Sequence, residues 1–163
     1  MYIDALLALS GSILGNTVTP QATFASGASV LSTNTIDLST AGIPATQVRD
    51  IAEGGEFAQA RIEIITAFTG GTSAEFQVIT ADDAALSVNV TVIGTTGPIA
   101  VAALTAGSRF AARINPRLAS KGQRYIGGRT VNVGVNTTGA IYMDIGAEVQ
   151  DGQKFYPVGF QVL

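Results

Sequence analysis

The chain of 163 residues contains no histidine, no cysteine and no tryptophan. Without histidine, no side chain titrates near neutral pH at its ordinary pKa, and Ser-His or Cys-His nucleophile pairs are excluded. Without histidine or cysteine, zinc, copper, haem and iron–sulfur sites also lose their usual ligands. We therefore expect a structural or binding protein, with no enzyme activity, no metal and no cofactor.

Charge is scarce as well. Charged residues make up 13% of the chain, against about 25% in an average protein. Such a composition is typical of β-rich secreted or virion proteins, or of a chain whose surface is largely covered by neighbours. The positive mean hydropathy of +0.36 favours a covered surface. A net charge of −3 argues against a nucleic-acid partner, because phosphate contacts need a basic surface.

Residues 1–29 differ from the rest and are predicted to form an N-terminal arm. A short apolar segment there carries Ile3, Leu6, Leu7, Ile13 and Leu14, the arm residues expected to make contacts. The spacing of the first three predicts one or two helical turns, too short to be stable alone. The arm either folds back to complete the core of its own domain or lies along a neighbouring subunit. Asp4 stands where a signal peptide would be basic, and no apolar run reaches the ~18 residues that span a membrane.

Residues 30–163 alternate with the period of β-strands. In the clearest segment, 57–68, one face is predicted to carry Ala58, Ala60, Ile62, Ile64, Thr66 and Phe68. A glycine turn at 70–72 leads to a second strand containing Phe76 and Val78. Further strands are predicted at 34–38, 47–51, 89–93, 99–105, 109–115, 125–135 and 140–149, with a turn at 94–98.

This pattern predicts an all-β protein, an antiparallel β-sandwich. The strand count favours a jelly roll, and an immunoglobulin-like sandwich is the alternative. Seven apolar side chains are expected to lie between the sheets: Ile62, Ile64, Phe68, Phe76, Val78, Phe110 and Ile114.

Two features could carry binding. Asp82 and Asp83 follow a strand, but two carboxylates are too few for calcium, and a turn is the better interpretation. Six of the nine basic residues lie within 109–129, a window without any acid. The candidate interface residues there are Arg109, Arg113, Arg117, Lys121 and Arg124. Such a strip docks on an acidic partner, contacts nucleic acid locally, or is simply a solvated face.

Several short motifs in order resemble the jelly-roll capsid cement (decoration) proteins of tailed bacteriophages. They are STNTIDL at 32–38, RDI at 49–51, GE at 55–56, FQV at 76–78, TADD at 80–83, L-x-x-G-x-x-F at 104–110, INP at 114–116 and YI at 125–126. The resemblance runs from about residue 30 to residue 149.

The resemblance implies a virion structural protein without enzymatic activity. Proteins of that family bind the outer face of an icosahedral head where capsid subunits meet, and they resist the pressure of packaged DNA. The expected partners are the major capsid protein and further copies of the chain, as a dimer or trimer, with no nucleic acid and no membrane. The protein would be made in the host cytoplasm and end on the outer surface of the virion. The alternative function is a carbohydrate- or receptor-binding β-sandwich module, although the chain lacks the tryptophan that such platforms often use.

Overall fold

A computed structural model describes residues 7–14, 17–23, 28–38, 58–114 and 123–147. Its regular elements are strands and one short 3₁₀ helix, η2 (Val101–Ala103). The strands are β1 (Ala8–Ser10), β2 (Ser12–Leu14), β3 (Thr17–Thr19), β4 (Gln21–Ala22), β5 (Ser29–Leu31), β6 (Ile36–Asp37), β7 (Ala58–Thr69), β8 (Ser73–Ala81), β9 (Thr91–Ala100), β10 (Arg109–Arg113), β11 (Tyr125–Val133) and β12 (Thr138–Ala147). Within these ranges no helix has the length and apolar character needed to cross a membrane.

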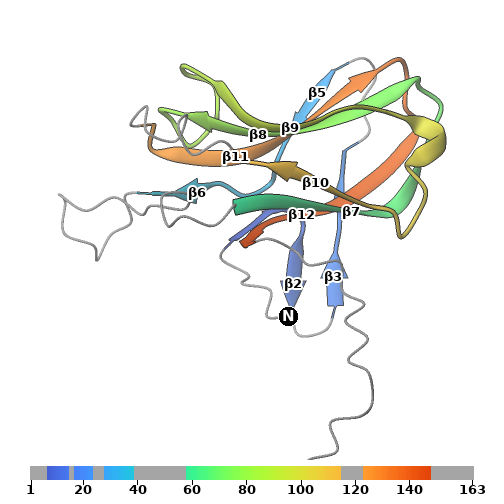
Figure 1. The fold of residues 1–163 in the computed structure, drawn as a ribbon, viewed down its shortest axis with the longest axis horizontal. Coiled ribbons are helices and arrows are strands. Elements are labelled where there is room, and N and C mark those ends of the chain that lie inside the picture. Colours follow the sequence, from blue (N-terminus) through green and yellow to red (C-terminus); the bar gives the residue numbers. More distant parts are fainter. Residues whose placement is uncertain (1–6, 15–16, 24–27, 39–57, 115–122, 148–163) are drawn as a thin grey trace, which may run out of the picture.

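Two antiparallel sheets pack face to face as a sandwich (Figure 1). In the first sheet, β12 pairs with β7 on one side and with β1 and β4 on the other, and β10 lies beyond β7. In the second sheet, β11 pairs with β8 on one side and with β5 and β6 on the other, and β9 lies beyond β8. The predicted all-β antiparallel sandwich is therefore confirmed.

The chain order of the strands can be compared with the jelly-roll prediction. β1 and β4 lie along the same edge of β12, and β5 and β6 along the same edge of β11, so each pair counts as one interrupted strand. Without β2 and β3, which form a separate two-stranded sheet, eight strands result among the described residues, in the spatial orders 1-8-3-6 and 2-7-4-5. This is the order that a jelly roll, built from two Greek keys, requires.

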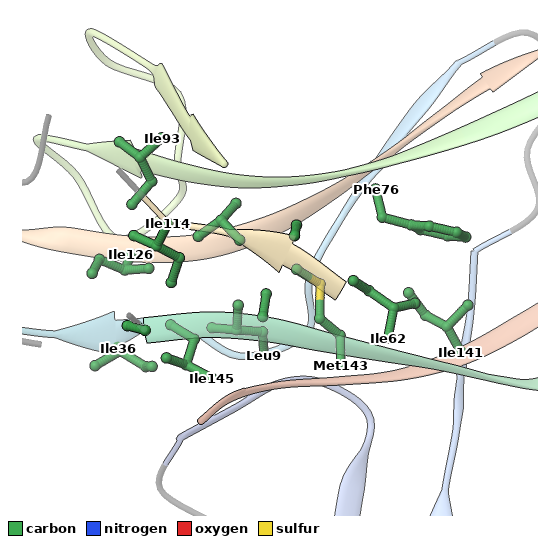
Figure 2. Packing of buried hydrophobic residues seen from close by; sticks show 14 of the residues in the cluster. Leu9, Ile36, Ile62, Phe76, Ile93, Ile114, Ile126, Ile141, Met143 and Ile145 are labelled. Atoms are coloured by element: carbon green, nitrogen blue, oxygen red, sulfur yellow. The ribbon is translucent and has the colours of Figure 1, made fainter. Parts of the chain in front are cut away.

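The core fills the space between the two sheets, and Figure 2 shows its large side chains pointing inward from both. Six of the seven predicted core residues are buried, and the seventh, Phe110, is half-buried and packs against them. Thr66 was expected to share their face, but it is exposed. The strand is irregular at that point, because the pairing of β7 with β12 shifts register between Ala140 and Ile141.

The turn predicted at 94–98 is wrong, because β9 runs through it from Thr91 to Ala100. The pairing of β9 with β8 shifts register at two places, so the strand continues through the glycines and the proline without a turn. The strand predicted at 99–105 is instead the end of β9 followed by η2. The strand predicted at 47–51 lies outside the described residues.

Gly94 brings the edges of the two sheets together on the β9–β10 side. A Cβ atom at this position would lie 2.6 Å from the backbone oxygen of Arg113 on β10. Since that oxygen belongs to the main chain, it cannot swing aside as a flexible side chain would. Glycine at position 94 therefore lets the edge strands of the two sheets approach each other closely.

We expect Gly94→Ala to lower the free energy of unfolding by about 1–3 kcal/mol, the usual cost of overpacking. Urea denaturation of the full chain measures this change. Gly146→Ala on β12 is the matched control, because a Cβ there meets only Arg61 Nε at 4.0 Å. Equal stability of the two variants would show that the approach of β9 to β10 is not tight.

Candidate interaction surfaces

The N-terminal segment divides into strands that belong to the sandwich and a hairpin that leaves it. Leu9 on β1 is fully buried, and Leu7 packs against the same core. Ser10 pairs with Met143 and Gln21 with Ile141, which are close neighbours on β12. Between these two points the chain leaves the sheet edge to form the β2–β3 hairpin. Of the other predicted arm residues, Ile3 and Leu6 lie outside the described ranges.

Gly11 forms the root of this hairpin. It has a φ of +80°, and a Cβ there would lie 2.5 Å from the backbone oxygen of Thr19. Both observations require glycine where the chain turns out of the sheet. The Asn34 side chain donates a hydrogen bond of 2.9 Å to the Gly11 oxygen, and the Asn34 backbone N–H donates one of 2.9 Å to the oxygen of Leu9. The loop after β5 thereby holds the root of the hairpin.

Gln21 fastens the other arm of the hairpin at the same place. Its amide nitrogen donates to the backbone oxygen of Leu31 at 2.7 Å, and its amide oxygen accepts from the backbone N–H of Thr33 at 3.0 Å. Gln21 pairs in the first sheet, whereas Leu31 belongs to the second. These bonds therefore join the two sheets at the edge opposite β9 and β10.

The hairpin carries the most exposed large apolar side chain that the structure describes, Leu14. It forms a separate two-stranded sheet in which Ile13 pairs with Val18 and Leu14 with Thr17. Figure 1 shows β2 and β3 extending away from the sandwich below β7 and β12. Leu14 is 85% exposed and Val18 37% exposed, while Ile13 is half-buried. An isolated two-stranded ribbon is marginally stable in water, so this exposure points to a partner.

The charge pattern sets the hairpin apart from the rest of the chain. No Asp, Glu, Lys or Arg occurs between Asp4 and Asp37. The hairpin and its root are therefore uncharged, and any surface that covers them must be uncharged too, because an unpaired buried charge is costly.

The described basic residues of the predicted strip lie in two places, Arg109 and Arg113 on β10 and Arg124 just before β11. Arg109 and Arg113 share the outward face of β10, and both are exposed. Arg109 faces Glu63 of β7 at 3.5 Å. Arg124 forms a two-pronged pair with Asp37 of β6, at 2.8 and 2.7 Å.

β10 lies at the edge of the first sheet beside β9, whereas β6 lies along the opposite edge of the second sheet. The structure therefore does not bring these three arginines together on one strand edge, and it gives two of them carboxylates of the same chain. Arg117 and Lys121 lie outside the described residues.

A buried ion pair, which the sequence analysis missed, lies on the outward face of the first sheet. Arg61 of β7 binds the carboxylate of Asp144 of β12 through both of its oxygens, with Nε at 2.8 Å from Oδ1. Asp144 is 2% exposed and Arg61 19%. Burial and the charge of Asp144 raise the pKa of the adjacent Tyr142 to about 12. Tyr142 is therefore neutral at physiological pH.

The two adjacent aspartates form a turn, as the sequence suggests. Asp83 accepts hydrogen bonds from the backbone N–H groups of Ser87 and Val88, both at 2.8 Å, and from the Ser87 hydroxyl at 2.7 Å. Asp82 accepts one from Asn89 at 2.6 Å. The loop folds Leu86 onto the outer face of the second sheet. Gly127 leaves room for it there, since a Cβ would lie 2.2 Å from a Leu86 methyl carbon.

This loop should respond to acid. The hydrogen bonds from Val88 and Ser87 lower the pKa of Asp83, so the ionised carboxylate favours the folded loop. A lowered pKa contributes stability above the unfolded value of about 3.9, and the contribution is lost as the pH falls through the lower folded value. We expect the amide chemical shifts of Ser87 and Val88 to stay constant from pH 7 to about 4.5 and to move towards random-coil values below. An Asp83→Asn variant should show no such transition. A transition in that variant would mean that the protonation of another group changes the loop.

Two kinds of binding site, a metal cluster and an exposed aromatic surface, are not found among the described residues. No cluster of three or more potential metal ligands occurs among them. Their five aromatic side chains are all buried or half-buried: Phe68, Phe76, Phe110, Tyr125 and Tyr142. In this part of the chain there is thus no exposed aromatic platform of the kind that carbohydrate-binding sandwiches use.

Comparison with known proteins supports the coarser part of the resemblance, a phage-associated protein. No curated protein gives a significant match. A family model, Bbp16, matches residues 19–145, which include strands β4 to β11 and most of β12. From its sequence and its antiparallel sandwich, the chain belongs to the Bbp16 family of phage-associated proteins.

Proposed function

We propose that this protein is a capsid decoration (cement) protein of a tailed phage. It binds the outer surface of the icosahedral head and stabilises the contacts between major capsid subunits. It has no enzymatic activity and no cofactor, acts as a homo-oligomer, and binds neither nucleic acid nor membrane. It is made in the host cytoplasm and becomes part of the virion.

The observation that carries the proposal is a sandwich whose two sheets are joined at both edges. From this sandwich extends an uncharged hairpin, β2–β3, whose base is held by hydrogen bonds and whose apolar side chains are partly exposed. On one side Gly94 lets β9 approach β10, and on the other Gln21 bonds the two sheets together. A protein that reinforces a shell under pressure needs such a stiff body, because a soft one would deform before its contacts bore load. The exposed hairpin supplies an attachment surface. Membership of a phage-associated family supports the same role.

The commitment of the charged groups to the protein's own structure also supports a non-catalytic role. Arg61, Arg109 and Arg124 each face a carboxylate of the same chain. Asp83 is occupied by a turn and Tyr142 is neutral. A catalytic acid or base must exchange protons with a substrate, and these groups hold the fold together instead.

A binding experiment tests the proposal. Purified full-length protein is added to phage heads that lack it, and bound protein and the temperature of DNA release are measured. We expect binding to saturate at a fixed number of copies per head and the release temperature to rise. Heads already carrying the protein are the control and should take up no more. Failure to bind, or binding without any rise in release temperature, would contradict a cement role.

A further inference from the structure

The lack of charge and the exposed apolar side chains of the hairpin β2–β3 indicate what kind of surface it binds. This inference rests on the proposed function. We infer that this hairpin docks into an uncharged, apolar recess of the capsid shell, and that attachment through it does not depend on charge. The binding partner of the hairpin is thus the capsid shell and not a second copy of the chain.

The outer faces of the sandwich make a second copy a poor receptor for the hairpin. Charged side chains point outward from both sheets, because the alternating partners in each strand face the core. These outward residues are Arg61 and Glu63 on β7, Glu75 on β8, Arg109 and Arg113 on β10, and Arg129 on β11. A hairpin laid on either face would bury charges against apolar side chains, which costs free energy.

The arrangement of the hairpin favours insertion into a recess. It extends away from the sandwich (Figure 1), and its side chains on both strands are exposed or half-buried. Its root is fixed by Gly11 and by the hydrogen bonds from Asn34, so little conformational freedom remains to be lost at this point when it docks. Leu14, the most exposed large apolar residue described, is the natural anchor.

The test introduces charges of both signs at the anchor. We expect Leu14→Asp and Leu14→Lys in the full-length protein each to weaken binding to undecorated heads by about tenfold or more, since either charge would be buried without a partner. Val88→Asp is the matched control, because Val88 is also exposed but lies on the loop over the second sheet. It should bind as the unmodified protein does. Since Leu14 is 85% exposed, the thermal midpoints of both Leu14 variants should equal that of the unmodified protein.

Salt dependence provides an independent measurement. Binding of the unmodified protein should change by less than about twofold between 0.1 M and 1 M salt, although the screening length falls from about 10 Å to 3 Å. A loss of binding for only one sign of charge at Leu14, or a steep salt dependence, would overturn the inference in favour of a charged partner surface.

The remaining outcomes separate this inference from the proposed function. If the unmodified protein does not bind heads, the proposed function fails. If it binds and both Leu14 variants bind equally well, the hairpin inference alone is wrong. If the Leu14 variants change the mass of the free protein in light scattering, the hairpin covers a second copy, and the inference is again wrong.

Discussion

Asp144→Ala should lower the free energy of unfolding by about 3 kcal/mol, near the lower end of the 3–5 kcal/mol typical of a broken buried ion pair. The reason is that Arg61 would lose both oxygens that neutralise it while remaining mostly buried. The partial exposure of Arg61, 19%, keeps the expected loss from being larger, since water can reach the guanidinium. The midpoint of urea denaturation, at unchanged slope, measures the effect.

Glu63→Ala provides the matched control for this variant. Glu63 also faces an arginine across neighbouring strands, but Arg109 is 77% exposed, so this pair should contribute only about 0–1 kcal/mol. If the two variants lost equal stability, water or other groups would be compensating the charge of Arg61, and the pair could not be regarded as buried.

Phe76→Ala should lower the free energy of unfolding by about 3–5 kcal/mol, the range for removing a buried aromatic ring. Phe76 is fully buried on β8. Its ring meets that of Phe68 edge-on, with 6.1 Å between the ring centroids, and stacks on that of Phe110, with 6.5 Å between the centroids. These contacts join β8 of the second sheet to β7 and β10 of the first, so the cavity would lie between the sheets. Thermal or urea unfolding monitored by circular dichroism measures the loss.

Val133→Ala is the corresponding control on the surface. Val133 is 51% exposed at the end of β11, and its truncation should change stability by less than about 0.5 kcal/mol. A similarly small loss for Phe76→Ala would mean that the sheets can close around the cavity and that the aromatic cluster does not hold them together.

Alternation predicted the inner faces of the sheets because one face of each strand must avoid water. Ile62, Ile64 and Val78 lie where a period of two places them. The same rule failed at Thr66, where a register shift changes the count of residues along the strand, whereas the wrong turn at 94–98 was predicted from glycine and proline. Glycine and proline there resemble a turn in sequence, and only pairing with β8 reveals a continuous strand.

The electrostatic partners could not be predicted because they are distant in sequence. Arg124 pairs with Asp37 across 87 positions, and Arg61 with Asp144 across 83. A stretch of sequence that contains no acidic residue therefore does not show whether its basic side chains are paired with carboxylates from distant strands of the sheet. The absence of charge between Asp4 and Asp37 is different, since it can be read directly from the sequence.

The N-terminal segment shows why apolar content alone does not locate an interface. Leu9 and Leu14 are equally apolar, but β1 pairs with β12 and buries Leu9, whereas the hairpin exposes Leu14. The difference depends on Gly11, where the chain turns out of the sheet, and on the hydrogen bonds that hold this turn.

A reconstruction of the phage particle by electron cryomicroscopy tests the central claim most directly. We expect density for the sandwich on the outer surface of the head, repeated on the order of hundreds of times according to the symmetry of the shell, with the β2–β3 hairpin directed at the capsid subunits. A few copies at the tail, as a receptor-binding module would show, or no copies on the particle, would contradict it.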